Sequence, residues 1–315
     1  MKEHLYGPYG STEPETARHV RECGGNAVWF HGFNPKGFDS AGTAGLHPCV
    51  EFKTFRASFD EHPELIPIGV DGKPIRYGRL VQGVCLSKTD FVEERMADLE
   101  AGMREFKPRG VWLDYLTYAG WFETPEPDLQ ESCFCPDCIE EFCRAEEVDA
   151  TSPAEILTKH EDSWTAHKCR RIDSLGRRFS AIIKNADPDC PVGIYMCPWT
   201  PDEFVRALTR IFAQDYRLLA EWADVFTPLM YAEKSGRPPE WSRTFLEATP
   251  RFVPEGVPVL PILDVLDFPE SVAALADSEV SSFGFQLFGG AKAFDDPEGR
   301  RHLTQAIAKL ESSRR

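Results

Sequence analysis

The chain has 315 residues, of which 42% are hydrophobic and 12% aromatic, enough for one large α/β barrel or two ordinary domains. Lys and Arg total 35 against 51 Asp and Glu, so a net charge of -16 should repel nucleic acid and anionic membranes and favour neutral or cationic small partners. No apolar run approaches the roughly 20 residues that span a bilayer, and no signal-peptide pattern opens the chain, so we expect a cytoplasmic protein.

Short apolar segments rich in β-branched and aromatic residues alternate with longer helical patterns. The eight expected barrel strands are, in chain order, 4–9, 26–33, 79–87, 110–116, 191–197, 224–232, 258–266 and 283–290. The segment 50–59 could be a further strand or a hairpin, and 34–78 has the least regular pattern. Because eight strand–helix units follow one another without a linker, the sequence predicts a single-domain (β/α)8 TIM barrel over residues 1–315, with an enlarged βα loop at about 117–160 after strand four.

In such a barrel, active-site residues lie at the carboxyl ends of the strands. The residues at those inferred ends are mostly carboxylates and aromatics: His31, Cys85, Asp114, Tyr195, Tyr231, Glu233, Asp264, Asp267 and Gln286. No phosphate-binding glycine loop is present, which argues against nucleotides and phosphoryl transfer. Carboxylates flanked by aromatic rings are what glycosidic bond cleavage requires, because one group protonates the leaving oxygen and another stabilises or attacks the oxocarbenium-like carbon.

Asp114 is the strongest catalytic candidate, since it ends the apolar strand "GVWL" and precedes an aromatic segment. Glu233 and Asp264 are candidates for the general acid, and Glu123 or Asp128 could reach the site from the loop. The alternatives are a loop-capping or Arg-paired role for Asp114 and a solvated position for Glu233.

The aromatic and polar residues around these carboxylates are candidates for substrate binding. They are His31, Tyr115, Tyr118, Trp121, Tyr195, Tyr231 and Gln286. Tyr and Trp can stack on the apolar face of a pyranose while their polar tips form hydrogen bonds, although a role in the loop core is an alternative for each. His31 could bind a sugar hydroxyl or satisfy a backbone group.

Three cysteines, Cys133, Cys135 and Cys138, form a C-x-C-x-x-C motif that leads into a helix. In a reducing compartment such clustering favours a metal over disulfides. Three thiolates can hold one Zn²⁺ if a fourth ligand arrives, and Cys85, Cys49, Cys143 or a nearby histidine could supply it. A zinc with four thiolates would be structural, because it leaves no open coordination position.

These motifs resemble those of the family 42 β-galactosidases and related uncharacterised glycoside-hydrolase-like barrels. The resemblance implies a structural zinc on Cys133, Cys135 and Cys138, with Cys85 as the upstream ligand. "GVWLDYLTYAG" is also similar to the G-I-x-x-D-x-x-R-Y-P strand of such barrels, and "DVFTPLMYA" to their D-x-x-x-P-M-x-Y strand. The chain departs from family 42 at strand four, where an Asn-Glu pair is replaced by Asp114 followed by Tyr115.

Taken together, the sequence predicts a glycoside hydrolase that acts on a small glycoside or oligosaccharide, with Asp114 as nucleophile or principal carboxylate and Glu233 or Asp264 as general acid/base. The alternatives are a catalytically inactive carbohydrate-binding barrel and a non-hydrolytic sugar enzyme, such as an isomerase or lyase. We expect no nucleic acid or membrane partner, and a homo-oligomer is possible.

Overall fold

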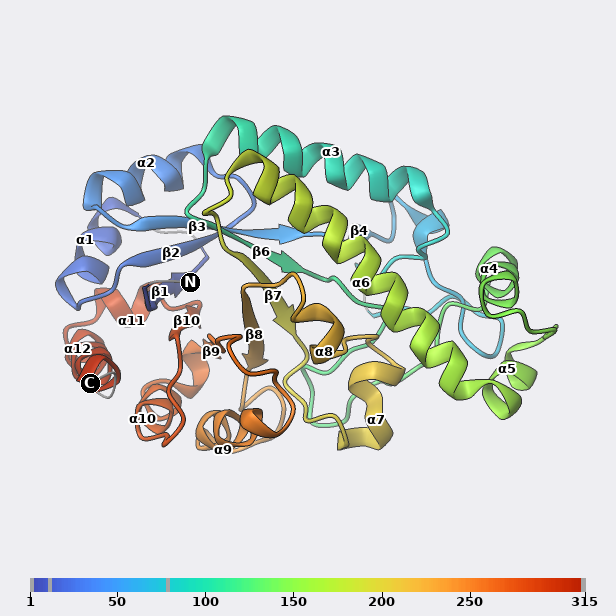
Figure 1. Ribbon diagram of the computed structural model, residues 1–315. Coiled ribbons are helices and arrows are strands. Elements are labelled where there is room, and N and C mark those ends of the chain that lie inside the picture. Colours follow the sequence, from blue (N-terminus) through green and yellow to red (C-terminus); the bar gives the residue numbers. More distant parts are fainter. Residues whose placement is uncertain (1–2, 11–12, 78–79, 313–315) are drawn as a thin grey trace.

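The computed structural model describes residues 3–10, 13–77 and 80–312, and its centre is a closed barrel of eight parallel strands (Figure 1). Around the barrel the strand order is β1-β2-β3-β6-β7-β8-β9-β10, and β10 pairs with β1. The strands are β1 (Leu5–Tyr9), β2 (Ala27–His31), β3 (His47–Lys53), β6 (Gly110–Asp114), β7 (Val192–Met196), β8 (Val225–Met230), β9 (Ile262–Asp264) and β10 (Gly284–Phe288). The predicted (β/α)8 barrel is confirmed.

The third barrel strand, however, was assigned wrongly. It is β3, which pairs in parallel with β2 on one side and β6 on the other, as in Phe30↔Val50 and Val50↔Val111. Of the predicted strand 79–87, Leu80–Gln82 forms β5, which pairs antiparallel with β4 (Arg56–Ser58) outside the barrel, and residue 79 lies outside the described residues. A proline and a charged glutamate interrupt the apolar pattern of β3 and obscure it in the sequence.

Helices surround the barrel and also fill the long loop after β6. They are α1 (Pro14–Glu22), α2 (Pro35–Ala44), α3 (Thr89–Phe106), α4 (Pro136–Glu146), α5 (Pro153–Lys159), α6 (Glu161–Ala186), α7 (Glu203–Arg210), α8 (Tyr216–Leu219), α9 (Trp241–Ala248), α10 (Glu270–Ala276), α11 (Ala291–Asp295) and α12 (Pro297–Ser312), with 3-10 turns at Pro63–Leu65, Thr249–Arg251 and Val265–Asp267. The two longest helices, α3 and α6, pack side by side across the outside of the barrel (Figure 1). The enlarged loop carries α4 and α5 and returns through α6, where the sequence predicted the excursion.

Local sequence explains where several helices begin and end. The Asn34 side chain accepts a hydrogen bond from the Gly37 amide (3.0 Å) at the start of α2, and the Ser152 hydroxyl accepts one from the Glu155 amide (3.2 Å) at the start of α5. Helix α2 ends at Gly45, whose φ of 70° is the left-handed conformation that glycine adopts without steric cost.

Aromatic side chains fill the lower interior of the barrel. Trp29 and Trp112 meet edge to face with ring centroids 5.4 Å apart, and the Trp112 indole N–H donates to the Thr227 hydroxyl at 2.8 Å. Gly193 makes room for this ring, since a Cβ there would lie 2.3 Å from Trp112 Nε1. The barrel is therefore a packed core below its carboxyl end, and an open space remains only above it. No helix among the described residues is both long and apolar enough to cross a membrane.

Candidate functional site

A cavity of about 260 Å³ opens at the carboxyl ends of the barrel strands. Six residues that the sequence singled out line it: His31, Asp114, Tyr115, Trp121, Tyr195 and Tyr231. The loop residue Glu123 also lines it, as do Tyr9, Lys53 and Arg56, which sequence reasoning did not select. The structure thus brings most of the predicted site together in one place.

Asp114 ends β6 in register with Lys53 of β3, and the carboxyl group of Glu51, two residues earlier on β3, lies within hydrogen-bonding reach of the Asp114 carboxyl group. Glu51 is fully buried, and its Oε2 lies 3.0 Å from His31 Nδ1 and 3.8 Å from Lys53 Nζ. The Tyr9 hydroxyl is a further hydrogen-bond partner of Glu51. Asp114 is only half-buried, so it is the member of the pair that faces the cavity.

Burial and mutual repulsion raise the proton affinity of this carboxyl pair. The pKa of Asp114 lies well above its ordinary value because burial disfavours its charge and Glu51 adds a second negative group beside it. Burial also raises the pKa of Glu51, although Lys53 and the hydrogen bond from Asp114 oppose the shift. Both shifts increase the affinity of the pair for a proton, which the two neighbouring carboxyl groups can share.

The backbone around Asp114 is held firmly from β3. The Thr54 amide (2.9 Å) and the Thr54 hydroxyl (2.7 Å) both donate to the Asp114 carbonyl oxygen. The Tyr115 amide donates to Asp114 Oδ1 at 2.9 Å, and Tyr115 itself has a φ of 56°, a left-handed conformation that costs a non-glycine residue about 1 kcal/mol or more. Such strain is typical of residues that a functional site holds in place.

Glu123 is a second carboxyl group with a raised proton affinity in the cavity. Burial is the main cause that raises its pKa to about 7; Asp114 and Asp264 add to the shift and Lys234 opposes it. Its loop is fixed by two backbone hydrogen bonds between Trp121 and Asp128, of 3.2 and 3.1 Å. Asp128 itself is exposed, and its side chain accepts from Gln130 instead of reaching the cavity.

Four other predicted residues do not line the cavity. Glu233 is exposed, and its amide donates to Asp267. Asp264 is buried and lies 2.6 Å from Lys234 Nζ. Gln286 lies below the cavity, where its Oε1 accepts from the Tyr195 hydroxyl at 2.7 Å, and Tyr118 is buried in the loop core near Arg171 and Lys168.

Sequence reasoning missed Glu51 because it misplaced the third barrel strand. A signal was present: a single glutamate stands inside the apolar run "CVEF", and a charged residue within a strand covered on both faces is rarely buried unless it has partners. Tyr9 was also overlooked, although it ends the predicted strand 4–9 and so met the strand-end criterion that selected Tyr195 and Tyr231.

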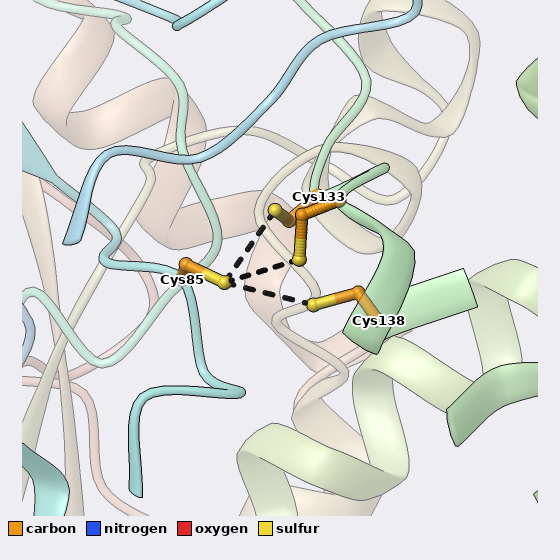
Figure 2. A group of neighbouring side chains, drawn as sticks. Cys85, Cys133 and Cys138 are labelled. Atoms are coloured by element: carbon orange, nitrogen blue, oxygen red, sulfur yellow. Dashed lines mark hydrogen bonds between the residues drawn. The ribbon is translucent and has the colours of Figure 1, made fainter. Parts of the chain in front are cut away.

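The three predicted cysteines of the enlarged loop meet Cys85, which lies between β5 and α3, and the four sulfur atoms all lie within 4.8 Å of one another. Cys85 Sγ lies 3.6 Å from the sulfurs of Cys133 and Cys135 and 3.7 Å from that of Cys138, as Figure 2 shows for the labelled residues. Disulfide sulfurs would be about 2.05 Å apart, whereas tetrahedral thiolates with 2.3 Å bonds to Zn²⁺ are about 3.8 Å apart. The four residues could therefore hold a metal ion.

Neighbouring groups support this cluster. The Ile68 amide donates to Cys133 Sγ at 3.3 Å, and the Ser87 hydroxyl lies 3.0 Å from Cys85 Sγ. Such donors are typical of the surroundings of metal-bound thiolates. The other candidates for the fourth ligand lie elsewhere: Cys49 is buried in β3, and Cys143 donates to the Ala150 carbonyl.

Buried ionic contacts tie the cluster to the barrel. Glu131, two residues before Cys133, accepts from Lys168 Nζ at 2.7 Å and lies 2.9 Å from Arg210. On the other side, Arg171 of α6 donates to the Leu86 carbonyl at 2.7 Å. Both chain segments that contribute cysteines to the cluster are thereby attached to α6.

No protein-family model and no curated protein matches the chain. Among solved structures, the PgaB (BpsB) glycoside hydrolase domain from Bordetella bronchiseptica superposes with a TM-score of 0.71 at 12% identity, over 95% of this chain and 98% of that one. The β-galactosidase from Rahnella sp. R3 gives 0.69 at 12% identity over 98% of this chain and 56% of its own, and a catalytic mutant of Gan42B, a GH42 β-galactosidase from G. stearothermophilus, gives 0.67 at 10% over 98% and 57%. The chain thus spans less than two thirds of the length of these β-galactosidases, and the similarity establishes a shared barrel fold.

Proposed function

We propose that the protein is a glycoside hydrolase that cleaves O-glycosidic bonds in its barrel-mouth cavity. The observation that carries this proposal is the Asp114–Glu51 carboxyl pair facing Glu123 among aromatic side chains. Two carboxyl groups with raised pKa values, Asp114 and Glu123, line the cavity, and a third, Glu51, is buried beside Asp114; acid–base cleavage of an acetal uses such groups. The names of the structural neighbours, a glycoside hydrolase domain and β-galactosidases, support the same reaction class.

Glu123 is the proposed general acid. A pKa of about 7 leaves about half of it protonated at neutral pH and most of it in mildly acidic solution, so it can donate to the leaving oxygen. Glu123 takes the general-acid role that the sequence suggested for Glu233 or Asp264. Glu233 is exposed and does not line the cavity, and Asp264 is paired with Lys234.

Asp114 is the proposed nucleophile or principal stabilising carboxylate, with Glu51 as the residue that holds its proton. When positive charge develops on the sugar, the shared proton passes from Asp114 to Glu51. That transfer leaves a carboxylate facing the cavity and a neutral carboxylic acid in the buried position, where a charge is most costly. Asp114 then forms a bond to the anomeric carbon or stabilises its charge.

The aromatic residues complete a site of suitable size and polarity for a sugar ring. Tyr115, Trp121 and Tyr231 line the cavity and offer faces for stacking and hydroxyl or N–H groups for hydrogen bonds. Burial raises the pKa values of Tyr115 and Tyr231, so both hydroxyls remain neutral donors.

The four cysteines are proposed to hold a structural Zn²⁺. Cys85, Cys133, Cys135 and Cys138 supply four sulfurs and leave no position for substrate, so the ion would stabilise the loop that carries Trp121 and Glu123. No catalytic step is assigned to it.

The test is release of reducing sugar from a panel of aryl and disaccharide glycosides by wild-type protein and by Asp114→Asn. We expect turnover by the wild type and a loss of about 10³-fold or more in the variant, the scale reached when a nucleophile or its activating partner is removed. Metal content and circular dichroism should be unchanged. Sugar binding without turnover by the wild type would instead identify the inactive carbohydrate-binding alternative.

A further inference from the structure

One wall of the cavity is basic in a chain whose net charge is -16. Lys53 at the end of β3 and Arg56 on β4 both line it, close to His31 on β2. The charge of the whole chain favours neutral or cationic substrates, but a ligand inside the cavity experiences the nearest groups most strongly. The chemistry of this wall therefore decides what binds there.

Of these three side chains, Arg56 has the fewest polar partners. Among the residues that the structure describes, its side chain makes no hydrogen bond and no ion pair, and its Nε is buried without a partner. The guanidinium lies over the Tyr115 ring, 5.6 Å from the centroid, which orients it along the cavity wall. Because an unpaired buried donor costs free energy, this arrangement needs a compensating partner, and a ligand in the cavity can supply one.

Lys53 also retains unused donors. Its Nζ lies 3.8 Å from Glu51 Oε2, beyond hydrogen-bond distance, and Glu51 already contacts Asp114 and lies 3.0 Å from His31. The raised proton affinity of the Asp114–Glu51 pair reduces the negative charge that it can offer to Lys53 and Arg56.

A cation near the cavity but outside its lining has a different environment. Lys234 lies 2.6 Å from the carboxylate of Asp264 and 4.5 Å from the ring centroids of Tyr231 and Phe288, so its charge is neutralised within the protein. Arg56 has no such carboxylate partner among the described residues. Arg56 and Lys53 are left as a one-sided anion-binding surface.

We infer that the substrate is an acidic glycoside, whose carboxylate, sulfate or phosphate group binds Arg56 and Lys53 while the sugar ring lies against Asp114. A guanidinium fork matches any of these groups with two parallel hydrogen bonds. The inference rests on the proposed glycosidase function and adds the substrate class to it. The neighbouring structures named as β-galactosidases do not suggest this class.

Calorimetric titration tests the inference without requiring turnover. Glucuronate and galacturonate are compared with glucose and galactose, and the 6-sulfates and 6-phosphates of the same sugars distinguish the source of the anion. We expect at least one acidic sugar to bind roughly 10- to 100-fold more tightly than its neutral counterpart, as charge-assisted hydrogen bonds imply.

Two variants and a control assign that preference to Arg56. Arg56→Gln should remove the preference, and Arg56→Lys should restore part of it. Arg76→Gln is the control, because Arg76 is exposed, its guanidinium lies over Phe59 and it does not line the cavity. With hydrolysed substrates, Arg56→Gln should raise KM for the acidic glycoside by a larger factor than KM for its neutral counterpart.

The outcomes separate the two proposals. Equal or tighter binding of the neutral sugars, or a preference that survives in Arg56→Gln, overturns the acidic-substrate inference even if neutral glycosides are hydrolysed. Tight binding of an acidic sugar that depends on Arg56, with no hydrolysis of any glycoside, supports this inference and refutes the glycosidase function.

Discussion

The cysteine cluster and the carboxyl pair each bring together groups that repel one another when charged. We expect the two sites to have opposite effects on the stability of the fold. Four sulfurs lie within 4.8 Å of one another on the loop, where one divalent ion would neutralise much of the thiolate charge. Asp114 and Glu51 meet at the barrel mouth, where only a shared proton and nearby cations relieve their repulsion. We therefore expect the first site to stabilise the fold and the second to destabilise it, as groups kept for chemistry commonly do.

The largest expected effect is loss of the metal site. Replacing Cys135 and Cys138 by serine should abolish stoichiometric zinc binding and lower the free energy of unfolding by roughly 4 kcal/mol, the scale associated with loss of a structural metal. Elemental analysis and chemical denaturation measure the two effects.

Cys143→Ser is the matched control, since Cys143 lies on the same helix as Cys138 but outside the cluster. It should retain the ion and most of the stability. Purified wild-type protein that contains no metal, with Cys133 and Cys135 freely alkylated, would contradict the zinc assignment.

A smaller effect, confined to activity, is expected at Glu123. Glu123→Gln removes the proposed general acid and should lower kcat by about 10²- to 10³-fold for glycosides with poor leaving groups, within the range of general acid catalysis. Aryl glycosides with good leaving groups should be affected less, because they need little protonation.

The pH dependence identifies the group. The wild-type rate should fall as pH rises through about 7, where Glu123 loses its proton, and this limb should vanish in the variant. Glu126→Gln, three residues along the same loop at an exposed position, should leave both rate and profile unchanged. A wild-type limb that persists in Glu123→Gln would assign it to another residue.

The two sites also differ in how far the sequence could predict them. The cysteine cluster could be predicted because three of its members lie within six residues, so local spacing alone brings them together. The fourth, Cys85, follows β5 and not a barrel strand, but it lies beside the other three, as the resemblance to known barrels implied. Seven of the eight barrel strands were readable as apolar runs between helical patterns.

Only one member of the carboxyl pair could be predicted from the sequence. The two residues lie far apart in the chain and meet because β3 pairs with β6. Asp114 followed a continuous apolar run and stood out. Glu51 lay in the segment 34–78, where the true third strand was hidden by Pro48 and by Glu51 itself. The strand was missed because of the same residue that the site uses. A buried charged residue interrupts the apolar pattern by which a strand is recognised in the sequence.

The smallest predicted effect concerns stability and has the opposite sign to that of the cysteine variants. Because the folded protein holds the Asp114 proton more tightly than the unfolded chain, the wild type loses stability as pH rises from about 4 through the raised pKa. Asp114→Asn removes this titration and keeps a donor toward Glu51. We expect it to stabilise the protein by about 1 kcal/mol at pH 8.

The gain should shrink toward pH 4, where the carboxyl group of the unfolded chain also binds its proton about half of the time, so thermal unfolding at pH 4, 6 and 8 measures the trend. Asp224→Asn is the contrasting variant: Asp224 accepts from the Val192 amide at 2.8 Å and pairs with Lys184 at 2.7 Å, so losing its charge should cost up to about 1 kcal/mol at pH 8. A destabilised Asp114→Asn at pH 8 would mean that the pair contributes to the fold as the cysteines do. A stabilised Asp114→Asn variant without activity would show instead that the carboxyl pair lowers the stability of the wild type in return for catalysis. The cysteine cluster would then have the opposite effect, raising stability without a role in catalysis.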